Sequence, residues 1–186
     1  MSRVIIVHGW GGSPESDFLP WAKEEFRKKG YEVVTPSMPD PNYPKIETWV
    51  PYLKEVVGKA KSTDIFIGHS IGVSTILRYL ETSPESVKVE KVIMVAPWAV
   101  SLSNLDDSDD EETAKPWLET PINFEKVKTK ADEFIAIFSD NDPYVPLDEN
   151  KKVFGEKLNA EIFVEHSKGH FNNMPQERPN LMELSL

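Results

Sequence analysis

Residues 63–79 read T-D-I-F-I-G-H-S-I-G-V-S-T-I-L-R-Y, and this stretch decides the fold. Its apolar run at 65–67 is typical of a short buried strand. Two glycines and a serine follow, and after them apolar residues recur at the spacing of a helix. These helical apolar positions are Val73, Ile76, Leu77 and Leu80. The sequence therefore predicts a strand, a tight turn and a helix, with Ser70 in the turn.

The turn G-H-S-I-G places glycine two residues before and two residues after Ser70. In a strand-to-helix turn, a side chain at position 68 or 72 would collide with the backbone around the serine, which explains both glycines. The turn leaves Ser70 strained and exposed at a helix N-terminus, where backbone N–H groups and the helix dipole favour negative charge. We therefore predict that Ser70 is a nucleophile whose developing oxyanion is stabilised there.

Strands and helices alternate on both sides of this turn. Apolar runs predict further strands, and amphipathic stretches predict further helices. The strands are expected at 3–7, 31–35, 89–96, 134–138 and 161–164, and the helices at 20–29, 47–61, 147–158 and near Leu181. This alternation predicts an α/β fold of three layers, with a mostly parallel sheet of about six strands and helices on both faces.

The length of 186 residues predicts a single domain, 1–186. Within it, residues 99–131 lack a clean period and carry an acidic run. A connection of that length without regular structure is either functional or mobile. We therefore expect a short lid or mobile insert within 99–131.

Composition and charge exclude several classes of protein. The chain has no cysteine, so it has neither disulfides nor thiolate metal sites, which is compatible with the cytoplasm. Its formal net charge is -10, and the acidic excess lies in the second half, which argues against a nucleic-acid or anionic-membrane partner. No apolar run approaches the length of a bilayer span, and the first strand begins too early for a signal peptide. We expect a soluble cytoplasmic protein.

A glycine-rich loop, H-G-W-G-G-S-P, follows the first strand at 8–14. In a parallel sheet this loop lies at the carboxyl edge, where ligands bind. Its spacing matches neither the dinucleotide-binding nor the P-loop signature. We expect its Trp10 N–H to form an oxyanion hole together with the N–H of Ile71.

The base and the acid are expected after the fifth and sixth strands, at the same edge of the sheet as Ser70. Of the four histidines, His170 follows a glycine in a loop that can bring its ring over Ser70. His8 and His69 are expected to brace loops, and His166 to lie at the surface. Both Asp140 and Asp142 could orient the base, and Asp142 is favoured because Pro143 restricts its backbone.

These motifs mark a family resemblance. H-G-W-G-G at 8–12, G-H-S-I-G around Ser70, S-D-N-D-P-Y-V-P around Asp142 and G-H-F at His170 are similar to those of the small serine hydrolases related to retinoblastoma-binding protein 9, within the α/β-hydrolase superfamily. The resemblance implies strand order 2-1-3-4-5-6 and a triad of Ser70, Asp142 and His170. Because this chain lacks cysteine, a cysteine-containing motif for a protein partner does not carry over.

The sequence thus predicts a serine hydrolase that cleaves small carboxylic esters through an acyl-enzyme on Ser70. Trp10 and Trp98 are expected to line an apolar pocket, and no metal or cofactor is expected. Amidase or thioesterase activity passes through the same intermediate and stays open. A protein that keeps the triad and acts by binding a partner is the alternative from another class.

Overall fold

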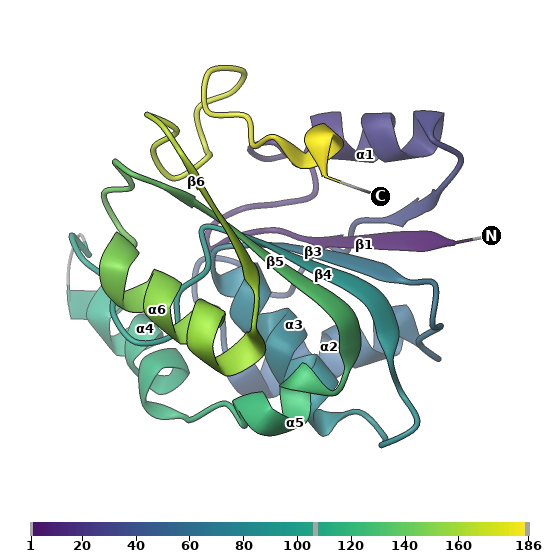
Figure 1. The fold of residues 1–186 in the computed structure, drawn as a ribbon. Coiled ribbons are helices and arrows are strands. Elements are labelled where there is room, and N and C mark those ends of the chain that lie inside the picture. Colours follow the sequence, from purple (N-terminus) through teal and green to yellow (C-terminus); the bar gives the residue numbers. More distant parts are fainter. Residues whose placement is uncertain (1, 106–107, 185–186) are drawn as a thin grey trace.

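The computed structural model describes residues 2–105 and 108–184, and it contains one six-stranded sheet (Figure 1). All strand pairs are parallel, and the order is β2-β1-β3-β4-β5-β6, as expected. The strands are β1 Arg3–Val7, β2 Glu32–Val34, β3 Ile65–His69, β4 Val89–Val95, β5 Ala131–Ser139 and β6 Glu161–Glu165. The helices are α1 Leu19–Lys28, α2 Ile46–Val57, α3 Ile71–Thr82, α4 Ser108–Glu119, α5 Phe124–Lys128, α6 Leu147–Leu158 and the 3-10 turn η1 Leu181–Glu183.

The central strands are apolar without alternation because both of their faces are covered. All five residues of β3 are buried, as are the last four of β1. The register pairs Ile67 with both Ile6 and Ile93, so three β-branched side chains lie side by side in the middle of the sheet. This packing fixes the carboxyl ends of β1, β3 and β4 next to one another.

The two faces of the sheet are covered unequally (Figure 1). In the described part of the chain, α1 and the C-terminal segment with η1 lie on one face, where Phe18, Phe26, Phe171 and Leu181 pack against the strands. Helices α2, α3, α5 and α6 lie on the other face and enclose the larger core. The three-layer α/β fold expected from the sequence is confirmed.

Several predicted boundaries differ from the structure; β5, for example, begins at Ala131 rather than at Phe134. Helix α2 ends at Val57 rather than at Lys61, because Gly58 adopts φ 60°, which ends the helix. The segment 99–131 is also more regular than expected, since it contains α4 and α5. Whether this segment moves as a lid stays a prediction.

Helix α4 is attached to the body of the protein at its C-terminal end. The guanidinium of Arg78 in α3 is buried and donates hydrogen bonds to Trp117 O (3.0 Å) and Thr120 O (2.6 Å). The Trp117 indole donates to Pro44 O and contacts the ring of Trp49 in α2. At the other end, the first turn of α4 carries acidic residues, which the helix dipole favours. Asp106 and Asp107 of the acidic run lie outside the described residues.

No helix in the described part of the chain has the length and apolar character needed to cross a bilayer.

Candidate active site

The turn between β3 and α3 has the predicted strand-turn-helix geometry, and its glycines are required by close approach. A Cβ on Gly72 would lie 2.5 Å from Val7 O, and one on Gly68 would lie 2.7 Å from Val73 N. The obstacles are therefore the end of β1 and the backbone of α3, rather than the backbone of the serine itself. Ser70 adopts φ 51°, a conformation that is strained for a residue with a side chain. The sharp turn places the Ser70 side chain at the N-terminus of α3, where the residue is buried, with 7% of it exposed, rather than exposed as expected.

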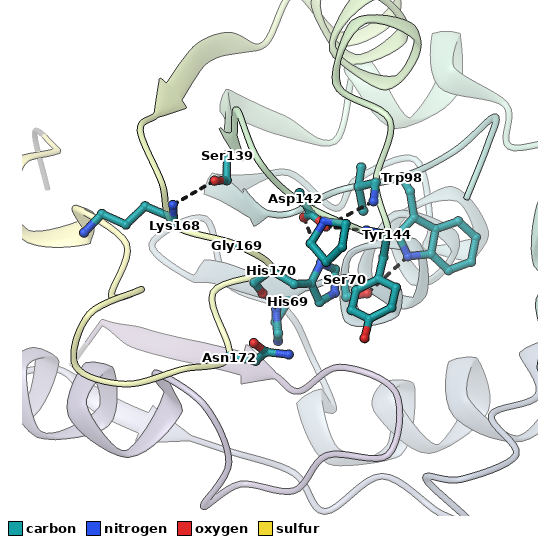
Figure 2. Close-up of polar contacts among 12 residues, drawn as sticks. His69, Ser70, Trp98, Ser139, Asp142, Tyr144, Lys168, Gly169, His170 and Asn172 are labelled. Carbon is teal, nitrogen blue, oxygen red and sulfur yellow. Dashed lines mark hydrogen bonds and ion pairs between the residues drawn. The ribbon is translucent and has the colours of Figure 1, made fainter. Parts of the chain in front are cut away.

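The hydroxyl of Ser70 has an unexpected partner. The indole of Trp98, which follows β4, donates a hydrogen bond from Nε1 to Ser70 Oγ at 3.2 Å (Figure 2). Trp98 is buried, and its carbonyl accepts a hydrogen bond from Ser74 in α3. The sequence predicted Trp98 only as a pocket wall. Because the indole donates, the Ser70 hydroxyl keeps its own hydrogen available for another acceptor.

The imidazole of His170 is bonded to the carboxylate of Asp142, at 2.8 Å between Nδ1 and Oδ2. A carboxylate only accepts, so Nδ1 carries the proton and the lone pair of Nε2 is left free. The other oxygen, Oδ1, accepts the backbone N–H groups of Tyr144 (2.9 Å) and Val145 (3.1 Å). These bonds hold the Asp142 carboxylate, of which only 2% is exposed, in one orientation.

The structure brings Ser70, His170 and Asp142 to one edge of the sheet, as the sequence predicted (Figure 2). Among the described residues, no hydrogen bond joins His170 Nε2 to Ser70 Oγ. Such contacts often form only once a substrate is bound. Tyr144 packs edge-on against the His170 ring, with 5.2 Å between ring centroids. The ring therefore has neighbours on its carboxylate side and against its face.

His8 braces the glycine-rich loop, in agreement with its expected structural place. Its Nε2 accepts the N–H of Met38 at 3.1 Å, so the ring is neutral, and its Nδ1 donates to Gly9 O at 2.8 Å. Burial lowers the pKa of His8, while the bond to Gly9 opposes that shift. His8 thus connects the glycine-rich loop to the loop after β2.

His69 contacts the main chain of His170, the expected base. A carbonyl can only accept, so the 2.8 Å contact means that His69 Nε2 donates to His170 O. The two imidazole rings lie 5.0 Å apart. The His69 Nδ1 atom lies 3.2 Å from Asp17 Oδ2 without the geometry of a hydrogen bond. The sequence indicated a loop brace at His69, but nothing in it pointed to Asp17.

Asp140 pairs with a different histidine. Its Oδ2 lies 2.6 Å from Nδ1 of the exposed His166, and its Oδ1 accepts the N–H of Ser167. The hydrogen bond from the Ser167 N–H, and to a smaller degree the one with His166, hold the pKa of Asp140 below its usual range. Of the two candidate acids, it is therefore Asp142 that contacts His170, and Asp140 holds the neighbouring part of the same loop.

The expected oxyanion donors lie beside Ser70 in the chain and in the cavity wall. Gly11 N–H donates to Pro41 O and Gly12 N–H donates to Gly9 O, so both of these amides are engaged. In the described part of the chain, the Trp10 N–H has no such partner. Ile71 is the first residue of α3, where an N–H lacks an acceptor within the helix. Trp10 lines the cavity and Ile71 is fully buried beneath it, and their joint role as an oxyanion hole stays a prediction.

A cavity of about 370 Å³ lies over Ser70 and His170. Trp10, Trp98 and Tyr144 supply aromatic surface, and two carboxylates, Asp17 and Asp110, also line it. Asp110 belongs to the first turn of α4, so part of the acidic run does reach the mouth of the cavity. Within residues 2–105 and 108–184, no three acidic or histidine side chains are grouped so that they could hold a metal ion.

A family model described as serine hydrolase matches residues 4–176, nearly the whole chain. The protein therefore belongs to the serine hydrolase family, and it is a hydrolase of the α/β class, as the motif resemblance implied.

Known relatives agree with this assignment. The chain is 28% identical over 170 residues to serine hydrolase RBBP9 of Rattus norvegicus, an alignment that covers 91% of this chain and 81% of that protein. The ydeN gene product of Bacillus subtilis has a similar crystal structure, with a TM-score of 0.83 at 24% identity over 92% of this chain and 89% of the other. Est1E from Butyrivibrio proteoclasticus, solved with ferulic acid bound, gives a TM-score of 0.74 at 15% identity, covering 95% and 84% of the two chains. At these sequence identities, the two solved structures show that this chain shares their fold.

Proposed function

We propose that this protein hydrolyses small carboxylic esters through an acyl-enzyme on Ser70, with His170 as the base and Asp142 as the residue that orients it. The observation that carries the proposal is the 2.8 Å bond between His170 Nδ1 and Asp142, in the cavity that also holds Ser70. This bond keeps the Nδ1 proton in place and leaves the Nε2 lone pair to accept the serine proton.

The reaction then proceeds in two halves. His170 Nε2 takes the hydroxyl proton as Ser70 Oγ attacks the carbonyl carbon, and the Trp10 and Ile71 N–H groups stabilise the oxyanion. The imidazolium returns that proton to the leaving alcohol oxygen as the C–O bond breaks. Water, deprotonated by the same nitrogen, attacks the acyl-enzyme, and collapse of the second oxyanion releases the acid and restores Ser70.

The cavity supports small and uncharged substrates. Its volume of about 370 Å³ lies at the small end of the range for ligand pockets. Trp10 and Trp98 give it apolar walls that suit a short acyl chain. The carboxylates of Asp17 and Asp110 disfavour a substrate that carries a negative charge. We infer a small neutral ester as substrate and a cytoplasmic location, the latter because the chain has no cysteine.

Covalent labelling with a fluorophosphonate tests the proposal. The parent protein is expected to be labelled at Ser70, which peptide mapping identifies, and Ser70→Ala is expected to remain folded and unlabelled. Turnover of p-nitrophenyl acetate by folded Ser70→Ala would remove Ser70 as the nucleophile. An unlabelled parent would instead favour a protein that acts by binding a partner.

The leaving group is tested separately with one acyl group. An acetate ester, an acetyl thioester and an acetanilide differ only in the bond that is cleaved. The ester is expected to have the highest kcat/KM, and a higher value for the thioester or the anilide would move the assignment to thioesterase or amidase.

A further inference from the structure

A closed set of hydrogen bonds ties the loop that carries His170 to the end of β5. The hydroxyl of Ser139 accepts the N–H of Lys168 at 2.9 Å (Figure 2). It also donates to Asn141 Oδ1 at 2.8 Å. The same Oδ1 accepts the N–H of Gly169 at 2.8 Å. Two consecutive amides directly before His170 are thus held by two side chains that also bond to each other.

The loop needs this support because its backbone is strained. Ser167 has φ 55° and Phe171 has φ 59°, and both conformations are costly for residues with a side chain. Gly169 between them has φ 50°. Three left-handed residues in a stretch of five do not reflect a local preference. Such a backbone persists only where surrounding contacts impose it.

Other contacts also hold this loop, and they act at other points along it. His69 Nε2 donates to His170 O, after the two amides, and joins the loop to the end of β3 rather than to β5. Asp140 binds His166 and Ser167 on the exposed outer side, where water and salt weaken an ion pair. Asp142 contacts the imidazole at Nδ1 and not the main chain of the loop. The main chain at 168–169 is fixed from β5 by Ser139 and Asn141.

We propose that Ser139 and Asn141 are positioning residues for His170, which place the free Nε2 relative to the Ser70 hydroxyl. This inference rests on the proposed function, in which that nitrogen takes the serine proton. A misplacement of about 1 Å between reacting groups lowers a rate by about 100-fold. Loss of the Asn141 acceptor frees the Gly169 amide and the Ser139 hydroxyl together, so the loop relaxes toward a less strained backbone.

Asn141→Ala tests the inference, since Asn141 is exposed and its replacement is expected to leave folding intact. We expect kcat for p-nitrophenyl acetate to fall by about 10- to 100-fold with KM within about twofold, and fluorophosphonate labelling to slow by the same factor. Asn141→Asp keeps the acceptor oxygen and is expected to recover most of kcat. Asn173→Ala is the matched control, because this exposed asparagine lies in the same loop region and its side chain has no hydrogen bond to the described residues.

A spectroscopic measurement separates positioning from general stability. The His170 Nδ1 proton bonded to Asp142 gives a downfield proton resonance, which should broaden or exchange faster in Asn141→Ala while the thermal midpoint changes little. Unchanged kcat, a rise in KM alone, or no recovery in Asn141→Asp would each overturn the inference. The resonance reports on the loop even without turnover, so a failed proposed function, seen as active Ser70→Ala, is distinguishable from failed positioning.

Discussion

Replacing Asp142 by asparagine should reverse the tautomer of His170. In the parent, Oδ1 accepts the N–H groups of Tyr144 and Val145, and Oδ2 accepts from His170 Nδ1. The new amide oxygen must stay at the Oδ1 position, because the opposite orientation turns an NH₂ group toward two N–H donors. The NH₂ group therefore faces Nδ1 and donates to it, which moves the imidazole proton to Nε2. A protonated Nε2 cannot accept the serine proton.

The structure gives the size of this effect. Turning the amide to recover the active tautomer leaves two backbone donors unpaired, at about 1–3 kcal/mol each. Since about 1.4 kcal/mol corresponds to a factor of ten, the active form is reduced by a factor between about 30 and about 10⁴. Loss of the carboxylate charge that stabilises the imidazolium adds to this. We therefore expect kcat to fall by about 10⁴, the scale known for a triad carboxylate.

The assay is steady-state hydrolysis of p-nitrophenyl acetate, together with urea unfolding to show that the isosteric change leaves stability nearly unaltered. Asp140→Asn is the matched control. Its Oδ1 can still accept the Ser167 N–H, and its ion pair with His166 is exposed, so kcat should fall less than about tenfold. A larger loss in Asp140→Asn than in Asp142→Asn would refute the assignment of the acid.

Three further outcomes are expected. Gly72→Ala should lower the unfolding free energy by about 2 kcal/mol or more, because the new Cβ meets Val7 O at 2.5 Å, whereas Gly155→Ala, whose Cβ has only a 3.8 Å neighbour, should raise it by about 0.5 kcal/mol in the same urea titration. Because burial lowers the pKa of His8, the unfolded chain binds a proton that the folded chain does not, so stability should fall as pH drops below about 6.5; His8→Asn should flatten that dependence, and parallel curves for the two proteins would contradict the reasoning. Neutral short esters should be cleaved faster than long-chain or carboxylate-bearing esters. Replacing the acidic residues in the first turn of α4 by asparagine and glutamine should raise kcat/KM for the anionic ester selectively at low salt, and this effect should weaken at about 0.1 M salt, where the Debye length is about 10 Å. An unchanged ratio of kcat/KM between the neutral and the anionic ester would contradict the charge argument. The residues to be neutralised are Asp109, Asp110 and Glu111.

Most of the fold was predictable because the strands are continuous apolar runs. Two-sided burial gives β3 and β4 that pattern, and the chain order then limits the possible topologies. Helix α4 escaped prediction because only Ala114 and Trp117 are buried along its length and Pro116 interrupts its pattern. Its position depends on the buried guanidinium of Arg78, a contact over a long distance in sequence that no local pattern reveals.

The site was predictable where a residue type is scarce and the chemistry demands it. Four histidines and two neighbouring aspartates left few combinations, and Pro143 favoured the aspartate that the structure places against His170. Asp17 and the bond from Trp98 to Ser70 depend on loops that meet only in the folded chain. For Ser139 and Asn141 a signal was present, since polar residues follow directly on a buried strand.

The indole N–H of Trp98 also provides an NMR signal that reports on the state of Ser70. The chain has five tryptophans, and three of the other four donate a hydrogen bond from the indole N–H to a main-chain oxygen. These three are Trp10, Trp49 and Trp117. Only for Trp98 is the acceptor the oxygen that an acyl or phosphonyl group would occupy. Esterification of Ser70 converts that acceptor from a hydroxyl to an ester oxygen. In a ¹⁵N-labelled sample, the Trp98 indole cross-peak should therefore shift as the adduct forms and return as it is hydrolysed, so each half of a turnover can be timed without a chromogenic substrate.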